Sequence, residues 1–194
     1  MIHQWIHLGF CFYKQKWLTN MRNPHHFQSI HYQPIRWSDI VADACDSLIK
    51  TNVEIIDWKN YLVNPLNFAN NNKIANKELF KLLIKQVVMN TYRAINTIYI
   101  YTHEHLNSRQ YGDKKLIHLS SVQNQWVNTM VVLQTAEVML DTNDTVELFY
   151  CIDLLVEVLH LLSVLAGARA IFKNHSIELM YHLTLFQKFS EEVL

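Results

Sequence analysis

From Lys77 onward, the spacing of hydrophobic residues along the chain predicts long helices. Between Lys77 and Leu106, apolar side chains recur three and four positions apart, which is typical of a helix with one buried face. These residues are Phe80, Leu83, Ile84, Val87, Val88, Ile95 and Ile98. A second stripe, between Lys115 and Leu140, contains Val122, Trp126, Met130, Leu133 and Leu140. We therefore expect helices over about 77–106 and 115–140.

Two further helices are predicted in the last third of the chain. Asp144 is followed three residues later by Glu147, which resembles a capping box at the start of a helix. The helix after Asp144 is apolar almost all round, so we expect it to be the most central. The last helix begins after Asn174. Because long helices with short connections pack as antiparallel neighbours, we expect an all-α fold with an up-down-up-down four-helix bundle over residues 73–194.

Residues 1–72 have a different character and are expected to form an N-terminal extension with one or two helices. The three prolines of the chain, Pro24, Pro34 and Pro65, all lie in this part, and proline interrupts helices. Ser38 and the residues after it are predicted to cap a helix that extends to about Lys50. The asparagine-rich run 67–72 is predicted to be a surface loop. We find no internal repeat and no convincing strand.

Composition limits the classes of function. Half of the residues are hydrophobic, which is typical of a globular domain. The formal net charge is zero, so we expect no nucleic-acid or anionic-membrane partner. A neutral, aromatic-rich chain favours association with other copies or chains. The three cysteines form no Cys-x-x-Cys pair, which predicts reduced thiols in the cytoplasm. The start of the chain, from Met1 to Trp5, lacks the basic segment of a signal peptide.

Two apolar or metal-like patterns have ordinary explanations. The most apolar segment, Leu148 to Ile171, also contains charged residues, so a buried core helix is expected rather than a membrane span. Within it, Glu157 and His160 form the Glu-x-x-His unit of di-iron proteins. Such sites need a second copy, which the sequence lacks. We expect these residues to form a polar stripe with Asp153, and we predict no metal site.

Three short segments, in order, give the chain a family resemblance. They are Ser108–Gly112 (Ser-Arg-Gln-Tyr-Gly), Leu165–Ile171 (Leu-Ala-Gly-Ala-Arg-Ala-Ile) and Ile177–Leu183 (Ile-Glu-Leu-Met-Tyr-His-Leu). The C-terminal helical domain of acyl-CoA dehydrogenases has Arg-x-Gln-Phe-Gly, Gly-Gly-Arg-Gly-Tyr and Val-Glu-Arg-x-Tyr-Arg-Asp at similar places between helices of similar length. The chain resembles that domain over roughly Glu78 to Leu194.

The resemblance implies a flavin dinucleotide (FAD) site. In the family, the turn after the first bundle helix meets the FAD of a neighbouring subunit, and the second segment approaches it closely. Carried over by position, the cofactor-binding residues would be Arg109, Gln110, Tyr111, Gly167 and Arg169. Counting on from Tyr181, the position of the family's catalytic glutamate in one branch is Glu191. The resemblance thus implies proton abstraction from an acyl thioester by Glu191.

The sequence also departs from the family pattern. Ser108 stands where the family has its phosphate-binding arginine, and Arg109 follows one residue later. Glu191 is followed by Glu192 and Val193 instead of Gly-Thr. Another branch takes its base from the first bundle helix, at a position near Leu82. The N-terminal helical domain and the middle β-domain of complete family members have no counterpart here.

Two functions follow from these observations. In the first, the chain is a partial flavoenzyme subunit, a flavin-dependent acyl-thioester oxidoreductase only when a partner chain supplies the missing domains. In the second, it is a flavin-free, catalytically degenerate bundle that serves as a binding or assembly module. Both imply a homo- or hetero-oligomer formed through the helices, and the isolated chain is expected to hold no cofactor by itself.

Overall fold

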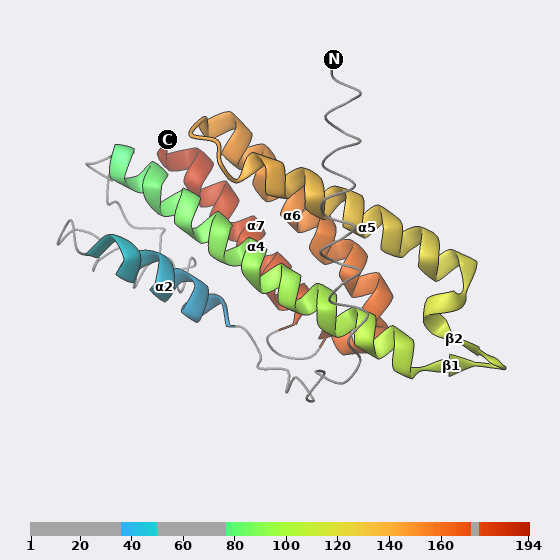
Figure 1. Cartoon of the computed structure of the whole chain (residues 1–194). Coiled ribbons are helices and arrows are strands. Elements are labelled where there is room, and N and C mark those ends of the chain that lie inside the picture. Colours follow the sequence, from blue (N-terminus) through green and yellow to red (C-terminus); the bar gives the residue numbers. More distant parts are fainter. Residues whose placement is uncertain (1–35, 50–76, 172–174) are drawn as a thin grey trace, which may run out of the picture. The chain divides into compact units, whose positions relative to one another are not determined.

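Every residue that the structure describes belongs to one compact unit, Pro34–Leu194. This computed structural model describes residues 36–49, 77–171 and 175–194 (Figure 1). Within these ranges, 88% of the residues are helical, counting five α-helices and two short 3-10 helices, so the predicted all-α class is confirmed. The α-helices are α2 (Trp37–Ile49), α4 (Lys77–Ser108), α5 (Ser120–Met139), α6 (Thr145–Ala166) and α7 (Ser176–Val193).

The first, third and last predicted bundle helices are confirmed as α4, α6 and α7. The second starts later than predicted, because the residues before Ser120 take other structures. Strands β1 (Gln110–Tyr111) and β2 (Lys114–Lys115) form an antiparallel hairpin, followed by the 3-10 helix η3 (Leu116–His118). Gly112, in the hairpin turn, has φ 60°, a value that favours glycine. The expectation that the chain has no strand is therefore wrong at this point.

The start of α6 shows how the predicted capping residues work. The Asp144 carboxylate accepts hydrogen bonds from the backbone N–H of Val146 (2.7 Å) and of Glu147 (3.2 Å). The Glu147 carboxylate does not return to the backbone directly. It accepts a hydrogen bond from the Thr142 hydroxyl, which in turn accepts one from the Asp144 N–H at 3.1 Å. Thr142 thus completes the box and satisfies a backbone donor that helix geometry leaves unpaired.

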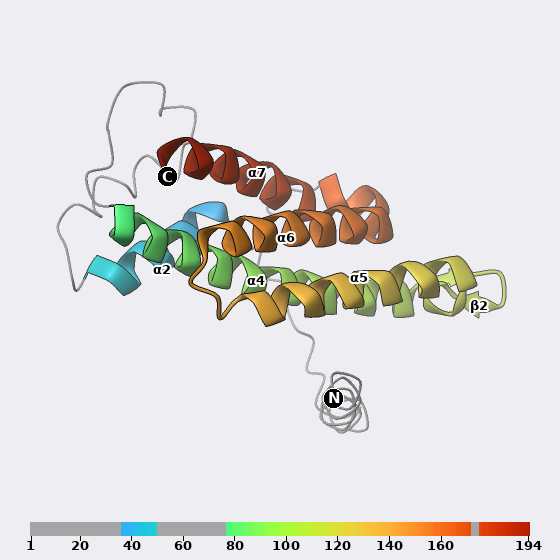
Figure 2. The same cartoon turned by 90° about the horizontal axis from the view of Figure 1, so that it is seen from above.

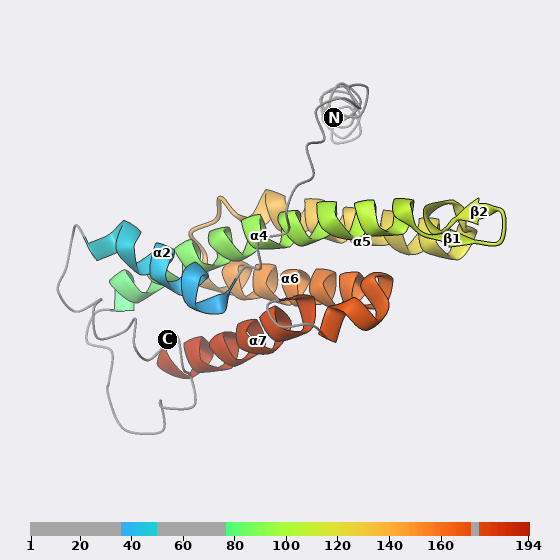
Figure 3. The same cartoon turned by 90° about the horizontal axis from the view of Figure 1, so that it is seen from below.

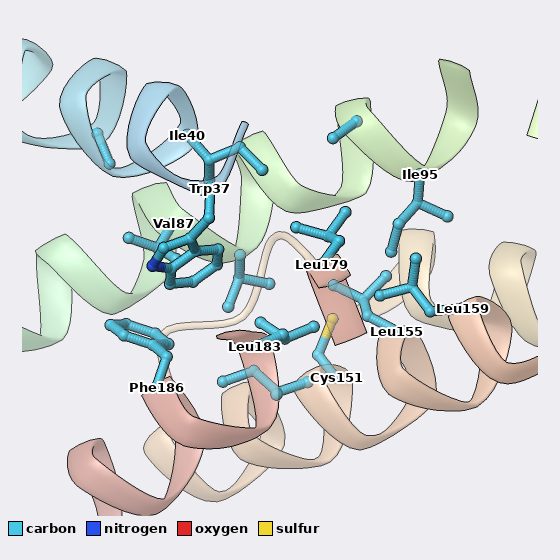
Figure 4. Close-up of a cluster of buried hydrophobic side chains, with 14 of the residues drawn as sticks. Trp37, Ile40, Val87, Ile95, Cys151, Leu155, Leu159, Leu179, Leu183 and Phe186 are labelled. Carbon is cyan, nitrogen blue, oxygen red and sulfur yellow. The ribbon is translucent and has the colours of Figure 1, made fainter. Parts of the chain in front are cut away.

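Helix α6 packs against α4, α5 and α7, as expected of the most apolar helix. Figures 1 and 2 show these four helices side by side. Side chains of α4, α6 and α7 meet in the buried cluster drawn in Figure 4, among them Ile95, Leu159 and Leu183. Each of these three is fully buried, and burial of apolar area is the main force that holds such helices together.

Helix α2 joins the same core although it falls in the predicted N-terminal extension. It begins at Trp37, one residue before the predicted cap, and the N–H groups of Asp39 and Ile40 donate to the Arg36 carbonyl. In Figure 3, α2 lies against α4, with its first turn near α7. Trp37 contacts α7 side chains and is 5% exposed. The predicted boundary at residues 72/73 and the loop 67–72 lie outside the described residues.

Among the residues that the structure describes, one helical stretch, Thr145–Ile171, is long and apolar enough to cross a membrane, and its most apolar window has a mean hydropathy of 2.0. Half of its most apolar window is buried inside the protein. A core helix that touches three neighbours meets the same criterion. The polar residues Asp153, Glu157 and His160 are exposed on α6, so a stripe on this helix faces outward.

Candidate functional site

The first family-like segment forms the end of α4 and the start of the hairpin. Helix α4 ends at Ser108, whose hydroxyl donates to the carbonyl oxygen of His105 at 2.9 Å. Arg109 lies beyond the helix, and its carbonyl oxygen accepts a hydrogen bond from the Leu116 N–H at 2.9 Å. Because α4 ends at Ser108, helix geometry does not fix the direction of the Arg109 side chain. Gln110 and Tyr111 are exposed, Tyr111 by 70%.

The second family-like segment forms the turn between α6 and the 3-10 helix η4 (Gly167–Ile171). Gly167 has φ 58° and ψ −134°, and its N–H donates to the carbonyl oxygens of Ser163 and Val164. A Cβ atom on Gly167 would meet no other atom within 4 Å, so the space beside this turn is open. The Arg169 guanidinium donates to the hydroxyl of Tyr101 on α4 at 3.3 Å. This hydrogen bond joins the second segment to the last two turns of α4.

These two segments, distant in sequence, lie at the same end of α4 (Figures 1 and 2). Four basic side chains near this end of α4 are linked by their electrostatic influence on one another. We refer to them as the basic cluster: His105, Arg109, Arg169 and His175. Burial, together with the guanidinium groups of Arg169 and then Arg109, lowers the pKa of His105. Burial also lowers the pKa of His175, with further contributions from Arg169 and His105.

The basic cluster differs from the other perturbed histidines. Burial lowers the pKa of His103, but the Glu104 carboxylate acts in the opposite direction. Burial lowers the pKa of His182 too, and there Glu178 opposes it. In the basic cluster the neighbouring charges that act on the imidazoles are cationic. Because like charges repel across a short distance, these cations act in the same direction as burial and disfavour the charged form of both imidazoles.

His175 precedes the first residue of α7, and its side chain is positioned by a contact with Ser176. Its Nδ1 lies 2.9 Å from the hydroxyl of Ser176, and both residues are buried. His105 is half-buried and lies one helical turn after Tyr101, on the same side of α4. Sequence analysis did not select either histidine. The i, i+4 spacing of Tyr101 and His105 near a helix end is a sequence signal that could have pointed to His105.

Glu191, the predicted catalytic base, lies elsewhere. It is exposed near the end of α7, where the Gln187 amide donates to the Asp153 carboxylate (2.8 Å) and to Glu191 (3.4 Å). At a helical rise of about 1.5 Å per residue, Glu191 lies roughly 24 Å along α7 from His175. The Lys77 ammonium donates to the carbonyl oxygen of Leu194 at 2.9 Å, so this end of α7 adjoins the start of α4.

The structure therefore brings the predicted cofactor-binding residues to one end of α4 and leaves Glu191 at the other. Leu82, the position of the alternative base, is 51% exposed and has no acid–base chemistry. Among the residues that the structure describes, no three histidine, cysteine, aspartate or glutamate side chains gather to hold a metal ion. Burial raises the pKa of Cys151 to about 11, so this thiol is not a reactive nucleophile.

Comparison with known proteins adds no relative. No protein-family model, no curated protein and no solved structure matches the chain.

Proposed function

We propose that the chain is a helical subunit similar to the C-terminal domain of acyl-CoA dehydrogenases, and that it contributes one wall of an FAD site. In this proposal α4 to α7 form an up-down-up-down bundle, whose short connections are the hairpin, residues 140–144 and the segment after η4. The family resemblance is limited to three segments, so the structural observation below carries the proposal.

The observation is that two segments similar to flavin-contacting loops of the family meet at one end of α4. The Arg169–Tyr101 hydrogen bond of 3.3 Å joins residues 68 positions apart. Around it, Arg109 and Arg169 supply guanidinium groups, which suit phosphate oxygens in charge and geometry. The open side of Gly167 leaves room for close approach of a ligand to the backbone. These groups fit the diphosphate of FAD.

In this proposal the remainder of such a site comes from another chain. The part of the structure that is described contains a two-stranded hairpin as its only sheet, so it supplies no β-domain to enclose a flavin ring. In the proposed reaction a carboxylate removes the α proton of an acyl thioester, and bound FAD supplies the hydride acceptor. The roughly 24 Å between Glu191 and the basic cluster is compatible with two different sites, each shared between subunits.

A binding or assembly module without flavin is the second candidate, and α5 favours it. Of the 20 residues in α5, Glu137 is the only one with a charge. Val127, Val131 and Val138 are 52%, 51% and 82% exposed on its outward side. An uncharged helix face with exposed valines suits contact with another protein.

The test is FAD titration of the purified chain, alone and with whatever chain co-purifies, followed by gel filtration and a visible spectrum. We expect retained flavin only with the partner. Replacing Arg169 by glutamine should weaken FAD binding roughly tenfold or more, because a charge-assisted hydrogen bond is worth about 1.5–3 kcal/mol. Arg93→Gln is the matched control, since Arg93 is an exposed α4 residue that donates to Asn90 at 3.2 Å. If no partner chain leads to retained FAD, the flavin proposal fails and the assembly module is the remaining candidate.

A further inference from the structure

Helix α5 packs on α6 through one side and exposes apolar residues on the other (Figure 2). Its buried residues are Thr129, Leu133 and Ala136. At about 100° per residue, the exposed Val131 lies roughly 200° around the helix from Leu133. The apolar side around Val131 is therefore directed away from the core that the described residues form.

The exposed side of α5 has the residue spacing of a coiled coil. Its positions alternate between three and four residues apart. They are Asn124, Val127, Val131, Gln134 and Val138, which we call the α5 seam. Gln134 is half-buried and the other four residues are exposed. This spacing matches the a and d positions of a heptad, through which two helices meet side by side.

The two ends of α5 carry opposite charges. The hairpin before the helix has Lys114 and Lys115 beside one acidic residue, Asp113, and the turn after the helix has Asp141 and Asp144. All five residues are exposed. An antiparallel copy of α5 brings the basic end of each chain beside the acidic end of the other, whereas a parallel copy brings like charges together. The distribution of charge thus favours an antiparallel copy of this helix as the occupant of the seam.

We propose that the α5 seam binds a second copy of itself in an antiparallel dimer with two-fold symmetry. This inference rests on the assembly-module candidate and names its partner as another copy of the chain. It does not depend on flavin.

The spacing of the seam fixes which residues meet. When one of two helices is reversed, the a positions of each face the d positions of the other. Val127 then meets Val138 of the copy, and Val131 meets Gln134 of the copy. The two Gln134 amides lie on either side of the two-fold axis. Because an amide carries both donors and an acceptor, it can pair with an identical amide, and one polar position in a seam selects the register.

The seam is also compatible with its own copy in charge. A two-fold axis sets a surface against itself, so a seam with charges of one sign would repel its copy. The only charged residue of α5 is Glu137, which lies beside the seam. With the axis between Val131 and Gln134, the two Glu137 carboxylates are roughly 13 Å apart along the helices. That separation exceeds the screening length of about 10 Å in 0.1 M salt.

The size of the contact sets the expected affinity. A helix of 20 residues is about 30 Å long and about 10–12 Å wide, so each copy contributes a strip of roughly 300–360 Å². Stable interfaces bury about 800 Å² on each partner. We therefore expect a weak dimer, with a dissociation constant of about 10–100 μM.

The first experiment is sedimentation equilibrium of the full chain from about 5 to about 300 μM, a range that spans the expected transition between monomer and dimer. Val131→Lys places two like charges beside the axis and should weaken the dimer at least tenfold. Val164→Lys is the matched control, because Val164 of α6 is 52% exposed and Val131 is 51% exposed. The control should associate as the natural chain does.

The second experiment tests orientation and register by disulfide formation. Val127→Cys and Val138→Cys are made as separate variants, each with Cys11→Ser, since the other two cysteines, Cys45 and Cys151, are buried. In the antiparallel dimer, identical positions are about 16 Å apart along the helices, too far for a disulfide. We expect oxidation to cross-link the two variants when they are mixed and neither variant by itself.

The other outcomes overturn the inference. They are a monomer at every concentration, a dimer that Val131→Lys leaves intact, and cross-linking of either variant by itself, which indicates a parallel pair. If the chain is monomeric while a different protein co-purifies with it and is lost on Val131→Lys, the assembly module stands and the self-association fails. Retention of FAD with a partner chain is measured separately and bears only on the flavin proposal.

Discussion

Replacing Trp37 by alanine should destabilise the protein strongly, because this residue fastens α2 to the helical core. Its ring stacks on His182 of α7, with centroids 5.9 Å apart and planes 5° apart. It also meets Phe186 edge-on at 5.7 Å. Trp37 is 5% exposed, and Phe186 is 1% exposed. The contact therefore belongs to the interior of the protein, and α7 has no other large aromatic partner on α2 to replace it.

The magnitude follows from the buried area. A large aromatic side chain buries about 150–250 Å², which at about 25 cal/mol per Å² corresponds to roughly 4–6 kcal/mol. This is an upper bound, because the unfolded chain already buries some apolar area. Tryptophan-to-alanine changes in protein cores cost about 3–5 kcal/mol. We expect a loss of about 3–5 kcal/mol in the free energy of unfolding for Trp37→Ala.

The assay is urea unfolding followed by far-UV circular dichroism, with free energies from linear extrapolation. Val138→Ala is the control, since Val138 is 82% exposed on α5, and its change should stay within about 0.5 kcal/mol. A loss below about 1 kcal/mol for Trp37→Ala, with an unchanged m value, would refute the argument that α2 shares the core of α4 and α7.

Three further predictions follow. Asp144→Ala removes an acceptor for two N–H groups at the start of α6 and should cost about 1 kcal/mol of unfolding free energy in the same urea assay; an unchanged midpoint would contradict the capping role. Gly167→Ala should lower the free energy of unfolding by about 1–3 kcal/mol through backbone strain alone, because the φ of Gly167 is 58° and the added methyl group meets no other atom. A stability equal to that of the natural chain would show that this strain is absent. Burial lowers the folded-state pKa of four histidines, which are His103, His105, His175 and His182. The unfolded chain therefore binds more protons, so thermal stability should be greatest above the unfolded value of about 6.5 and fall as the pH drops below it; melting temperatures that stay level from pH 8 to pH 5 would contradict this.

The long helices could be predicted because their patterns are long. Helix α4 carries its apolar stripe through 32 residues, and the cap of α6 has a residue-level signal in Asp144. The hairpin could not be predicted in this way. Its strands have two residues each, too few to show the alternation that identifies a strand. Gly112 was visible in the sequence, but a lone glycine does not distinguish a helix end from a hairpin turn.

The candidate site was only partly accessible from the sequence. Arg109 and Arg169 were selected through the family resemblance, and the structure brings them to the same end of α4. His175 was not selected, because no spacing along the chain relates it to His105. The electrostatic influence of His105 on His175 depends on how α7 packs beside α4 and α6, which is a property of the folded chain. The contact between Trp37 and His182 was hidden for the same reason.

The position of α6 has a consequence for the synthesis of the protein. At about 5–20 residues per second, a ribosome needs roughly 1–5 s to make the stretch from the end of α6 to the end of α7. During that interval α6, whose most apolar window has a mean hydropathy of 2.0, exposes to solvent the side that later packs against α7. Helix α5 precedes α6 and contacts it, so pairing of these two neighbours can begin first. We expect chaperones that bind emerging chains to engage α6 in this interval.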